Sequence, residues 1–317
     1  MKSILITGGS GFLGIHLALK LKKKFRVILA GRNNKQNFYA KKRTTCEVIP
    51  LDVSNIESVR DAINFSKPNI IIHAAATKFV DLSEKHPFEC TDININGTTN
   101  IARVAIDKSV ETVIGISTDK ASPPIRNIYG MSKSLMEKIF ISLDKSHKTK
   151  FACVRYGNVV WSTGSVLTVW NDMFKKNKII YTTGPYMRRF FFTVHEAVAL
   201  VITCLERIDS LSGKILSREM KAAQMIDILK VWIKIYGGKF KISKERPGER
   251  VDEFLIGETE LEYTQKKIIK EIDHYIIDFK NKCQKPLTEI ISSNNCKKLN
   301  FFEIKKILEL KKIYENF

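Results

Sequence analysis

The chain of 317 residues is long enough for one large domain or two modest ones, and its 44% hydrophobic content excludes a disordered protein. The net charge of +20 comes mostly from lysines spread along the whole chain, which favours small anionic ligands such as nucleotides and predicts no nucleic-acid partner. No apolar run is long enough to span a bilayer, and the N-terminus leads directly into a strand pattern, so we expect a cytoplasmic protein without membrane contact. The scattered cysteines and histidines predict neither a metal site nor a disulfide framework.

Short apolar runs alternate with helical patterns in the first half of the chain. The runs typical of strands cover residues 3–7, 26–31, 46–52, 69–75, 112–118 and 151–157. They are apolar on both faces, as the buried strands of a parallel sheet are. The segments between them, such as "IESVRDAINF" and "MSKSLMEKIFISL", have helical spacing. This alternation predicts an α/β fold with a doubly wound parallel sheet, the Rossmann arrangement.

The pattern changes after Asn158. Residues 161–187 are rich in Gly, Thr and Tyr, whereas "TVHEAVALVITCLERI" (193–208) again predicts a helix, which returns to the first domain. We therefore expect a smaller, discontinuous second domain over the carboxyl ends of the strands. Residues 1–160 and 188–215 form the predicted dinucleotide-binding domain, and residues 161–187 and 216–317 form the predicted substrate-binding domain.

The first predicted strand runs into a glycine-rich turn, "ITGGSGFLG", which precedes a helix. Gly8 can turn sharply, Gly11 lets backbone approach a pyrophosphate at the helix N-terminus, and Gly14 lets helix and strand pack closely. Because the glycines stand between a strand and a helix, a dinucleotide site is favoured over a tight turn without a ligand. The candidate residues are Thr7, Gly8, Ser10, Gly11, Phe12, Leu13 and Gly14.

The end of the second strand indicates which dinucleotide binds. NAD sites usually have Asp or Glu there, whereas this chain has Arg32, Asn33 and Lys35. Cations suit a 2′-phosphate, so NADP is favoured over NAD, and a solvated basic loop is the alternative. Further cofactor candidates follow the third and fourth strands: Asp52 and Val53 near the adenine, and Ala74, Ala75 and Ala76 where the cofactor can lie close to backbone.

The segment "STDKASPPIRNIYGMSK" (117–133) gathers several proton-carrying side chains. Tyr129 and Lys133 are four residues apart, so they share one helix face. The ammonium lowers the cost of a phenolate and can hold a nicotinamide ribose, and a Tyr with a depressed pKa can take a proton from a sugar hydroxyl. A chance pair is the alternative, but the upstream dinucleotide turn favours a catalytic one.

A series of motifs occurs in the order of a known family: "TGGSGFLG", "HAAATKFVDLSEKHP", "NINGT", "STDKA", "YGMSK", "RYGNVVWSTGSV", "MRRFFFTVHEAV" and "RPGERVDEFLI". Over essentially its whole length, the chain resembles an extended short-chain dehydrogenase/reductase. More narrowly, it is similar to the UDP-N-acetylglucosamine (UDP-GlcNAc) 4,6-dehydratases, which begin pathways to amino-deoxysugars. The resemblance implies tightly held NADP, a UDP-sugar in the second domain and a homo-oligomer.

The resemblance also implies catalytic roles. Tyr129 would deprotonate the C4 hydroxyl while NADP+ accepts a hydride, Lys120 would remove the C5 proton, and Asp119 would protonate the departing C6 hydroxyl. Thr118 would hydrogen-bond the sugar. An amine can act as the base only when neutral, so we expect burial and neighbouring cations, Lys133 or Lys78, to depress the pKa of Lys120 strongly.

Substrate-binding residues are implied in the same way, with ordinary surface ion pairs as the alternative for the arginines. The candidates are Lys78 near the sugar or its phosphate, Asn158, Thr163, Gly164, Ser165, Val166 and Leu167 on the diphosphate and uracil side, Arg189 and Arg246 near phosphate or ribose, and Glu249 near the ribose hydroxyls. An Arg fork binds phosphate through two hydrogen bonds.

Two departures from the family pattern bear on the site: the Pro123–Pro124 insert before Tyr129, and Trp161 where the family often has Gly, which would change the pocket near the nucleotide. Tyr129 itself is a feature of the soluble members and implies inversion at C5, giving an L-arabino 4-keto product. The alternatives are a 4-epimerase or 4-reductase of the same fold, which would not need the Asp119–Lys120 pair, and a non-catalytic NADP-sensing protein.

Overall fold

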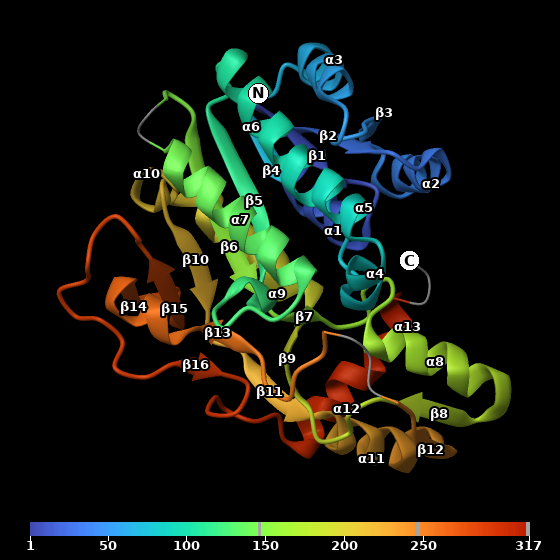
Figure 1. Ribbon diagram of the computed structural model, residues 1–317. Coiled ribbons are helices and arrows are strands. Elements are labelled where there is room, and N and C mark those ends of the chain that lie inside the picture. Colours follow the sequence, from blue (N-terminus) through green and yellow to red (C-terminus); the bar gives the residue numbers. More distant parts are fainter. Residues whose placement is uncertain (145–146, 245–247, 315–317) are drawn as a thin grey trace.

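A nine-stranded sheet forms the centre of the computed structural model, counted over the residues that it describes, 1–144, 147–244 and 248–314 (Figure 1). The strands lie in the order β14 (Thr264–Ile269), β15 (Ile272–Ile277), β10 (Ile215–Arg218), β6 (Lys150–Tyr156), β5 (Thr112–Thr118), β4 (Ile70–His73), β1 (Ser3–Thr7), β2 (Arg26–Gly31) and β3 (Glu47–Pro50). From β10 to β3 the pairs are parallel, and β15 and β14 add antiparallel strands at one edge. The predicted doubly wound parallel sheet is confirmed.

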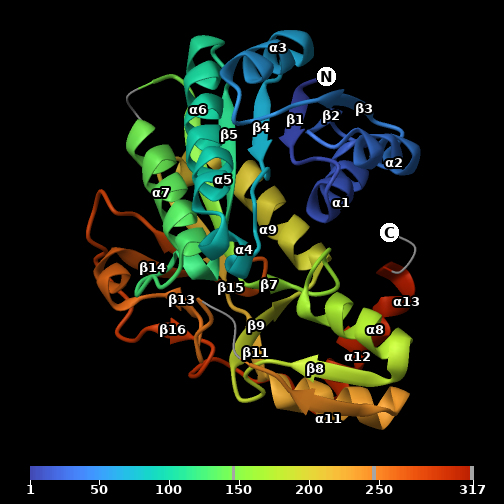
Figure 2. The same cartoon turned by 45° about the vertical axis from the view of Figure 1, so that its right-hand side comes forward.

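Helices cover both faces of this sheet (Figures 1 and 2). One face carries α1 (Phe12–Leu21), α2 (Asn34–Thr44) and α9 (Val194–Glu206), and the other carries α3 (Ile56–Ser66), α6 (Gly97–Asp107) and α7 (Ile128–Leu143). Because both faces are covered, every residue of β1 and β5 is buried, which explains their unbroken apolar sequence. The predicted helix over 193–208 is α9, which begins with a capping box between Thr193 and Glu196.

The second part of the chain lies at the end of the sheet where the parallel strands finish (Figure 2). Its strands are β7 (Asn158–Val159), β9 (Arg188–Phe192) and β11 (Lys221–Gln224) in one small sheet, and the pairs β8 (Ile179–Thr182) with β12 (Lys239–Ile242) and β13 (Phe254–Ile256) with β16 (Ile291–Ser292). Its helices are α8 (Val166–Asn177), α11 (Met225–Tyr236), α12 (Phe301–Glu309) and α13 (Lys311–Tyr314).

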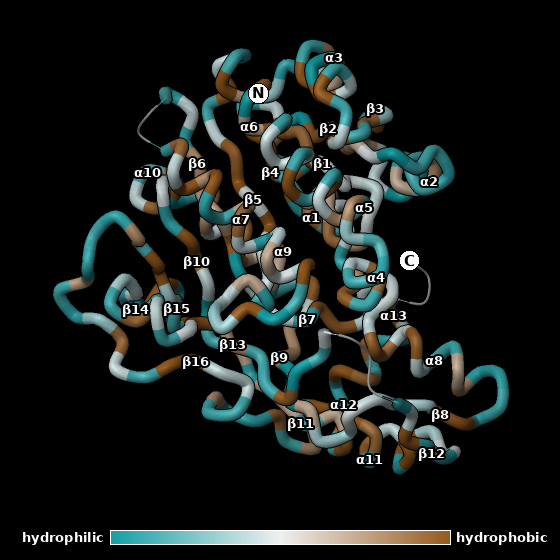
Figure 3. The backbone as a smooth tube through the Cα atoms, viewed as in Figure 1, coloured by the Kyte–Doolittle hydropathy of each residue, from teal (hydrophilic) through white to brown (hydrophobic). Residues whose placement is uncertain are grey.

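The predicted domain boundaries stay a prediction. The strands β14 and β15 belong to the large sheet, although their residues fall in the 216–317 range that we assigned to the substrate domain. The same contiguous apolar core includes residues of the sheet and residues of the second part, such as Phe190 and Trp232. Figure 3 shows the hydrophobic stretches concentrated along the central strands and the hydrophilic ones along the outer loops.

Short elements complete the part of the chain that the structure describes. They are α4 (Val80–Lys85), α5 (Pro87–Thr91), α10 (Ile208–Leu211), the π-helical turn η1 (Asp92–Asn96) and the 3-10 turns η2 (Asp119–Ala121) and η3 (Glu258–Tyr263). None of the helices among the described residues is both long enough and apolar enough to cross a bilayer.

Candidate active site

A cavity of about 920 Å³ lies between the large sheet and the second part. It begins at the turn between β1 and α1, passes the ends of β4, β5 and β6, and reaches Tyr181 and Met225. Strand β1 lies between β2 and β4, so the winding of the sheet reverses there, and ligands of doubly wound folds bind in the crevice outside such a switch point. The volume of the cavity is at the upper end of the range found for sites that bind small molecules.

The cavity brings together most of the residues predicted from the sequence. Its wall includes Gly8, Ser10, Gly11, Phe12, Leu13, Gly14, Arg32, Asn33, Asp52, Val53, Ala74, Ala75, Ala76, Lys78, Thr118, Lys120, Tyr129, Lys133, Asn158, Thr163, Gly164, Ser165, Val166, Leu167, Arg189 and Glu249. Thr7, Lys35 and Asp119 do not line it. Arg246 lies outside the described residues.

Two glycines shape the dinucleotide end. Gly8 has φ +66°, in the left-handed region, and a Cβ there would lie 2.8 Å from the Ala75 nitrogen. A Cβ on Gly14 would lie 2.5 Å from Gly9, so the first turn of α1 can pack against the loop only without a side chain. Thr7 is not part of this wall because its hydroxyl joins β1 to β4, through His73 Nδ1 at 2.8 Å and the Ala75 nitrogen at 3.2 Å.

The end of β2 presents a cation to the cavity. The Arg32 side chain is 61% exposed, and its guanidinium lies 3.8 Å from the Glu89 carboxylate. Asn33 caps α2 by accepting a hydrogen bond from the Gln36 nitrogen at 3.0 Å. This loop therefore places an Arg and a helix N-terminus where NAD sites usually place a carboxylate. Lys35, inside the first turn of α2, does not contribute to the wall.

A chain of polar contacts follows the carboxyl end of β5. The Thr118 hydroxyl donates to Asp119 Oδ1 at 3.0 Å, and Lys120 Nζ approaches the same oxygen at 3.1 Å. Tyr129, in the first turn of α7, lines the cavity as Thr118 does. Asp119 is fully buried, and its other oxygen, Oδ2, has no hydrogen-bond partner within the described ranges. Thr118, Asp119 and Lys120 are thus linked by hydrogen bonds.

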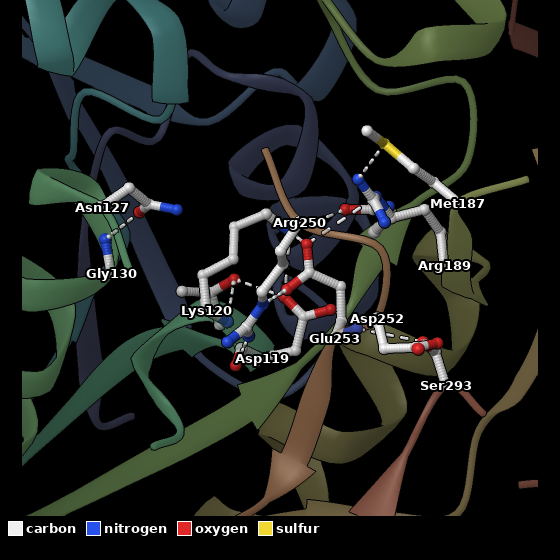
Figure 4. A network of polar contacts seen from close by, with 12 residues as sticks. Asp119, Lys120, Asn127, Gly130, Met187, Arg189, Arg250, Asp252, Glu253 and Ser293 are labelled. Carbon is white, nitrogen blue, oxygen red and sulfur yellow. Dashed lines mark hydrogen bonds and ion pairs between the residues drawn. The ribbon is translucent and has the colours of Figure 1, made fainter. Parts of the chain in front are cut away.

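Lys120 is held by oxygens from three separate segments, and Figure 4 shows two of these residues, Asp119 and Glu253. Besides Asp119, its Nζ lies 3.2 Å from Asn158 Oδ1 and 3.5 Å from Glu253 Oε1. Glu253 in turn accepts from Arg250 Nε at 2.6 Å and lies 3.7 Å from Arg189 Nε. We call Asp119, Lys120, Arg189, Arg250 and Glu253 the Lys120 cluster.

The pKa of Lys120 differs from our expectation. Burial lowers it, but the charges of Asp119 and Glu253 outweigh burial and raise the pKa above its usual value. The neighbours of Lys120 are carboxylates rather than the cations Lys133 and Lys78 that we predicted. Burial raises the pKa of Asp119, which lets this carboxyl hold a proton.

The expected pKa of Tyr129 was also wrong. Burial raises it to about 12, and the nearby charge of Lys120 offsets only part of this effect. Lys133 does not pair with the phenol, since its Nζ lies 3.0 Å from the sulfur of Met136. Burial lowers the pKa of Lys133 to about 8. The tyrosine is therefore a neutral phenol here.

The far end of the cavity is built around the N-terminus of α8. Gly164 has φ +71°, and a Cβ there would lie 2.4 Å from the ring of Phe79, so the ring rests directly on the glycine. Trp161 has φ +58°, which explains why Gly suits this position, but its side chain does not line the cavity. Its Nε1 donates instead to the Ile307 carbonyl oxygen at 2.7 Å. The predicted change of pocket shape by Trp161 was therefore wrong.

Sequence reasoning missed several residues that hold the site. Glu253 lines the cavity, and Arg250 Nη1 donates to the Pro124 carbonyl oxygen at 2.7 Å, which ties down the Pro123–Pro124 insert. Asn94 bonds the Thr77 nitrogen and oxygen at 2.9 and 3.0 Å and thereby positions the segment before Lys78. The only available signal was membership of the motifs "RPGERVDEFLI" and "NINGT".

Comparisons with known proteins agree with this geometry. Residues 4–273 match the family model described as "Polysaccharide biosynthesis protein". The chain is 34% identical to an uncharacterized membrane protein of Methanocaldococcus jannaschii, over 97% of this chain and 95% of that protein. It is 31% identical to the UDP-glucose 4-epimerase of Rickettsia bellii, again over 97% and 95%. The X-ray structure of Pen from Bacillus thuringiensis matches with a TM-score of 0.88 and 26% identity, over 100% of this chain and 98% of Pen.

The family match covers well over half of the chain, and these matches identify a nucleotide-sugar enzyme of the dehydratase and epimerase type. The chain therefore belongs to the polysaccharide biosynthesis protein family of extended short-chain dehydrogenases/reductases.

Proposed function

We propose that the protein is an NADP-dependent UDP-GlcNAc 4,6-dehydratase. The observation that carries this proposal is the Asp119–Lys120 pair, with 3.1 Å between carboxylate and amine, in which Lys120 lines the cavity that begins at the dinucleotide turn, as Tyr129 does. Loss of water across C5 and C6 needs a base for the C5 proton and an acid for the departing oxygen at the same time. An amine and a protonated carboxyl next to each other supply both groups.

The residues at the β1 end fit a nicotinamide dinucleotide. Gly8 and Gly14 leave backbone without side chains at the N-terminus of α1, and Arg32 offers a guanidinium for a 2′-phosphate. Lys133 and Tyr129 lie on the wall where a nicotinamide ribose would be held. When bound, NADP supplies a hydride acceptor for C4 and a hydride donor for C6.

Arg32→Ala tests the choice of NADP over NAD. We expect the variant to bind NADP about ten- to hundredfold more weakly, because a charge-assisted hydrogen bond to phosphate is lost, and to bind NAD as before. Fluorescence titration with both dinucleotides measures this. An equal loss of affinity for NADP and NAD would show that Arg32 does not bind the 2′-phosphate and belongs to a solvated basic loop.

The proton balance of the reaction gives each side chain a role. The C4 hydroxyl loses one proton, the leaving oxygen at C6 gains one, and C5 loses one proton and later gains another. A neutral phenol cannot accept a proton, so Tyr129 first releases its own to solvent and then accepts the C4 proton as a phenolate. Asp119, whose pKa is raised by burial, delivers a proton to O6. At the end of the cycle Tyr129 gives the C4 proton back to solvent.

Lys120 takes the C5 proton. Proton transfer from Lys120 to Asp119, which lie 3.1 Å apart, produces a neutral amine and a protonated acid together. This transfer resolves the conflict between the raised pKa of Lys120 and its role as a base. We propose that solvent, and not Lys120, supplies the new C5 proton from the opposite face of the sugar, so that the configuration is inverted and the product is the L-arabino 4-ketosugar.

Incubation with UDP-GlcNAc tests the proposal. The product should lose the mass of one water in mass spectrometry, and NMR after reaction in D₂O should show a 4-keto-6-deoxy sugar with deuterium at C5 and inverted configuration. No loss of water from any UDP-hexosamine would refute the dehydratase.

A UDP-sugar 4-epimerase is the second candidate, favoured by the 31% identity to the Rickettsia bellii enzyme of that name. An epimerase has no elimination step, so Lys120→Ala should leave an epimerase active and abolish a dehydratase. A thermal melt of the variant would confirm that loss of activity is not loss of folding.

A further inference from the structure

Glu253 occupies a place in the Lys120 cluster for which the proposed reaction gives no role. Its side chain is 3% exposed and lines the cavity, just before β13. One oxygen, Oε1, faces Lys120 Nζ at 3.5 Å and Arg189 Nε at 3.7 Å, and the other, Oε2, accepts from Arg250 Nε at 2.6 Å. Figure 4 shows the carboxylate among these three cationic side chains.

We propose that Glu253 is a positioning residue that holds the Lys120 ammonium at the cavity and keeps it protonated between turnovers. This inference rests on the proposed function, because it concerns the same amine that takes the C5 proton. Glu253 acts through Lys120 and not on the substrate. It supplies a fixed negative charge at the same Nζ that Asp119 contacts.

Glu253 is suited to this role because its own charge is stable. Burial raises its pKa, but Lys120, Arg189 and Arg250 together hold the pKa below its ordinary value. A carboxylate that stays ionised is a poor proton donor and a good counter-ion. Asp119 is its opposite, because burial raises its pKa and Oδ2 has no partner in the described structure. The two carboxylates that contact Lys120 therefore have different roles, because Asp119 exchanges protons whereas Glu253 stays ionised.

The position of Glu253 is fixed from outside the cavity. Arg250 also donates to the Pro124 carbonyl oxygen at 2.7 Å and approaches the Asp119 carbonyl oxygen at 3.5 Å. The backbone nitrogen of Glu253 donates to Ser293 Oγ at 3.0 Å. These contacts attach the carboxylate to η2 and β16, so that its distance to Lys120 does not depend on a flexible loop.

The neighbouring Asp252 provides a matched control. It forms a comparable ion pair, with Arg188 Nε at 2.5 Å and Nη2 at 2.7 Å, but it does not line the cavity. Glu253→Gln and Asp252→Asn each remove one negative charge from adjacent residues without a change of shape. Any general effect of lost charge in this segment will appear in both variants.

The test is an NMR titration of the Lys120 amine in protein labelled with ¹³C at lysine Cε, with the signal assigned by its loss in Lys120→Arg. Tyr129, Asp119 and Arg189 face the amine in all variants, so only the counter-ion changes. We expect the pKa of Lys120 to fall by at least about 1 in Glu253→Gln and to stay unchanged in Asp252→Asn. An unchanged value in Glu253→Gln, or an equal fall in both variants, would overturn the inference.

The dependence of kcat/KM on pH supplies a second readout that a merely structural residue would not move. Lys120 and Asp119 share one proton in the active state, and its loss leaves no acid for O6, so the falling limb reports this loss. A lower pKa of Lys120 therefore moves the falling limb to lower pH in Glu253→Gln. A limb that stays in place contradicts the inference. The NMR titration needs no substrate, so it remains decisive even if UDP-GlcNAc loses no water and the dehydratase proposal fails.

Discussion

Two buried groups of charges lie close together in this protein and differ in how completely they are satisfied. Arg155, Glu137 and Glu260, which we call the Arg155 cluster, are each at most 2% exposed. The five N–H groups of Arg155 make five hydrogen bonds, to both oxygens of each carboxylate and to the Leu255 carbonyl oxygen. None of the three side chains lines the cavity.

The Lys120 cluster has similar residue types but is incomplete. Asp119 keeps a buried oxygen without a partner among the described residues, and Lys120, Arg189 and Glu253 face the cavity. A fully bonded buried ion network can stabilise a unique packing, whereas an unsatisfied one costs stability and is found where function requires it. The comparison therefore separates a structural cluster from a chemical one, and substitutions in each should affect different properties.

Asp119→Asn should have the largest effect, and that effect should be on activity. Without an acid for O6, turnover of UDP-GlcNAc should fall about a hundredfold to ten-thousandfold. Glu253 and Asn158 still hold Lys120, so the free energy of unfolding should change little. Steady-state kinetics and urea unfolding measure the two quantities. A large loss of stability would show that the Lys120 cluster is structural, as the Arg155 cluster is.

Glu260→Ala should have the converse effect on the Arg155 cluster. It leaves a buried guanidinium with half of its carboxylate partners, so the free energy of unfolding should fall by about 3–5 kcal/mol. Glu262→Ala, in the same η3 turn, is the control. Its ion pair with Lys282 is exposed, so no measurable change is expected. Similar stabilities for both variants in denaturant titrations would show that the Arg155 cluster is not structural.

Lys133→Met tests a buried charge that has no carboxylate contact of the Arg155 kind. Burial lowers the pKa of Lys133 from 10.5 to about 8, so the unfolded chain binds the proton more strongly between these values. The wild-type free energy of unfolding should therefore rise with pH across this window. At neutral pH the variant should be more stable by roughly 3 kcal/mol, and the difference should shrink as pH rises. A difference that is constant with pH would contradict the assignment.

Trp161→Phe should have the smallest effect, because Trp161 lies outside both clusters. The variant loses one hydrogen bond to the Ile307 carbonyl oxygen, which should cost about 1 kcal/mol of unfolding free energy. Turnover should be unchanged, since the side chain does not line the cavity. Chemical denaturation measures the stability and an activity assay measures turnover. Altered kinetics would show that Trp161 does affect the nucleotide pocket.

The large sheet and much of the site could be predicted from the sequence because their signals are local. Strands buried on both faces are continuous apolar runs, and the contact between Asp119 and Lys120 joins residues that are adjacent in the chain. Helix α8 was not predicted, although Leu167, Trp170 and Phe174 have helical spacing, because residues 161–187 were described only by their Gly, Thr and Tyr content.

The charges around Lys120 could not be predicted because the fold alone brings them together. Glu253 and Arg250 come from a distant segment, and their contacts turn the expected depression of the Lys120 pKa into an increase. The expected phenolate at Tyr129 failed for a related reason, since the extent of burial around α7 cannot be read from a spacing of four residues. Sequence motifs predicted candidate reacting groups, but not their protonation.

Helix α7 carries Tyr129, Lys133 and Glu137 at successive intervals of four residues, so its first three turns connect the cavity to the Arg155 cluster. A rotation or slide of this helix that relaxes one end must displace the other. Substitutions around Arg155 that are meant to raise the thermal stability of the enzyme will therefore also change the position of the Tyr129 side chain. Variants selected for thermal stability should therefore also be assayed for catalytic activity, because the same helix, α7, contacts both the cavity and the Arg155 cluster.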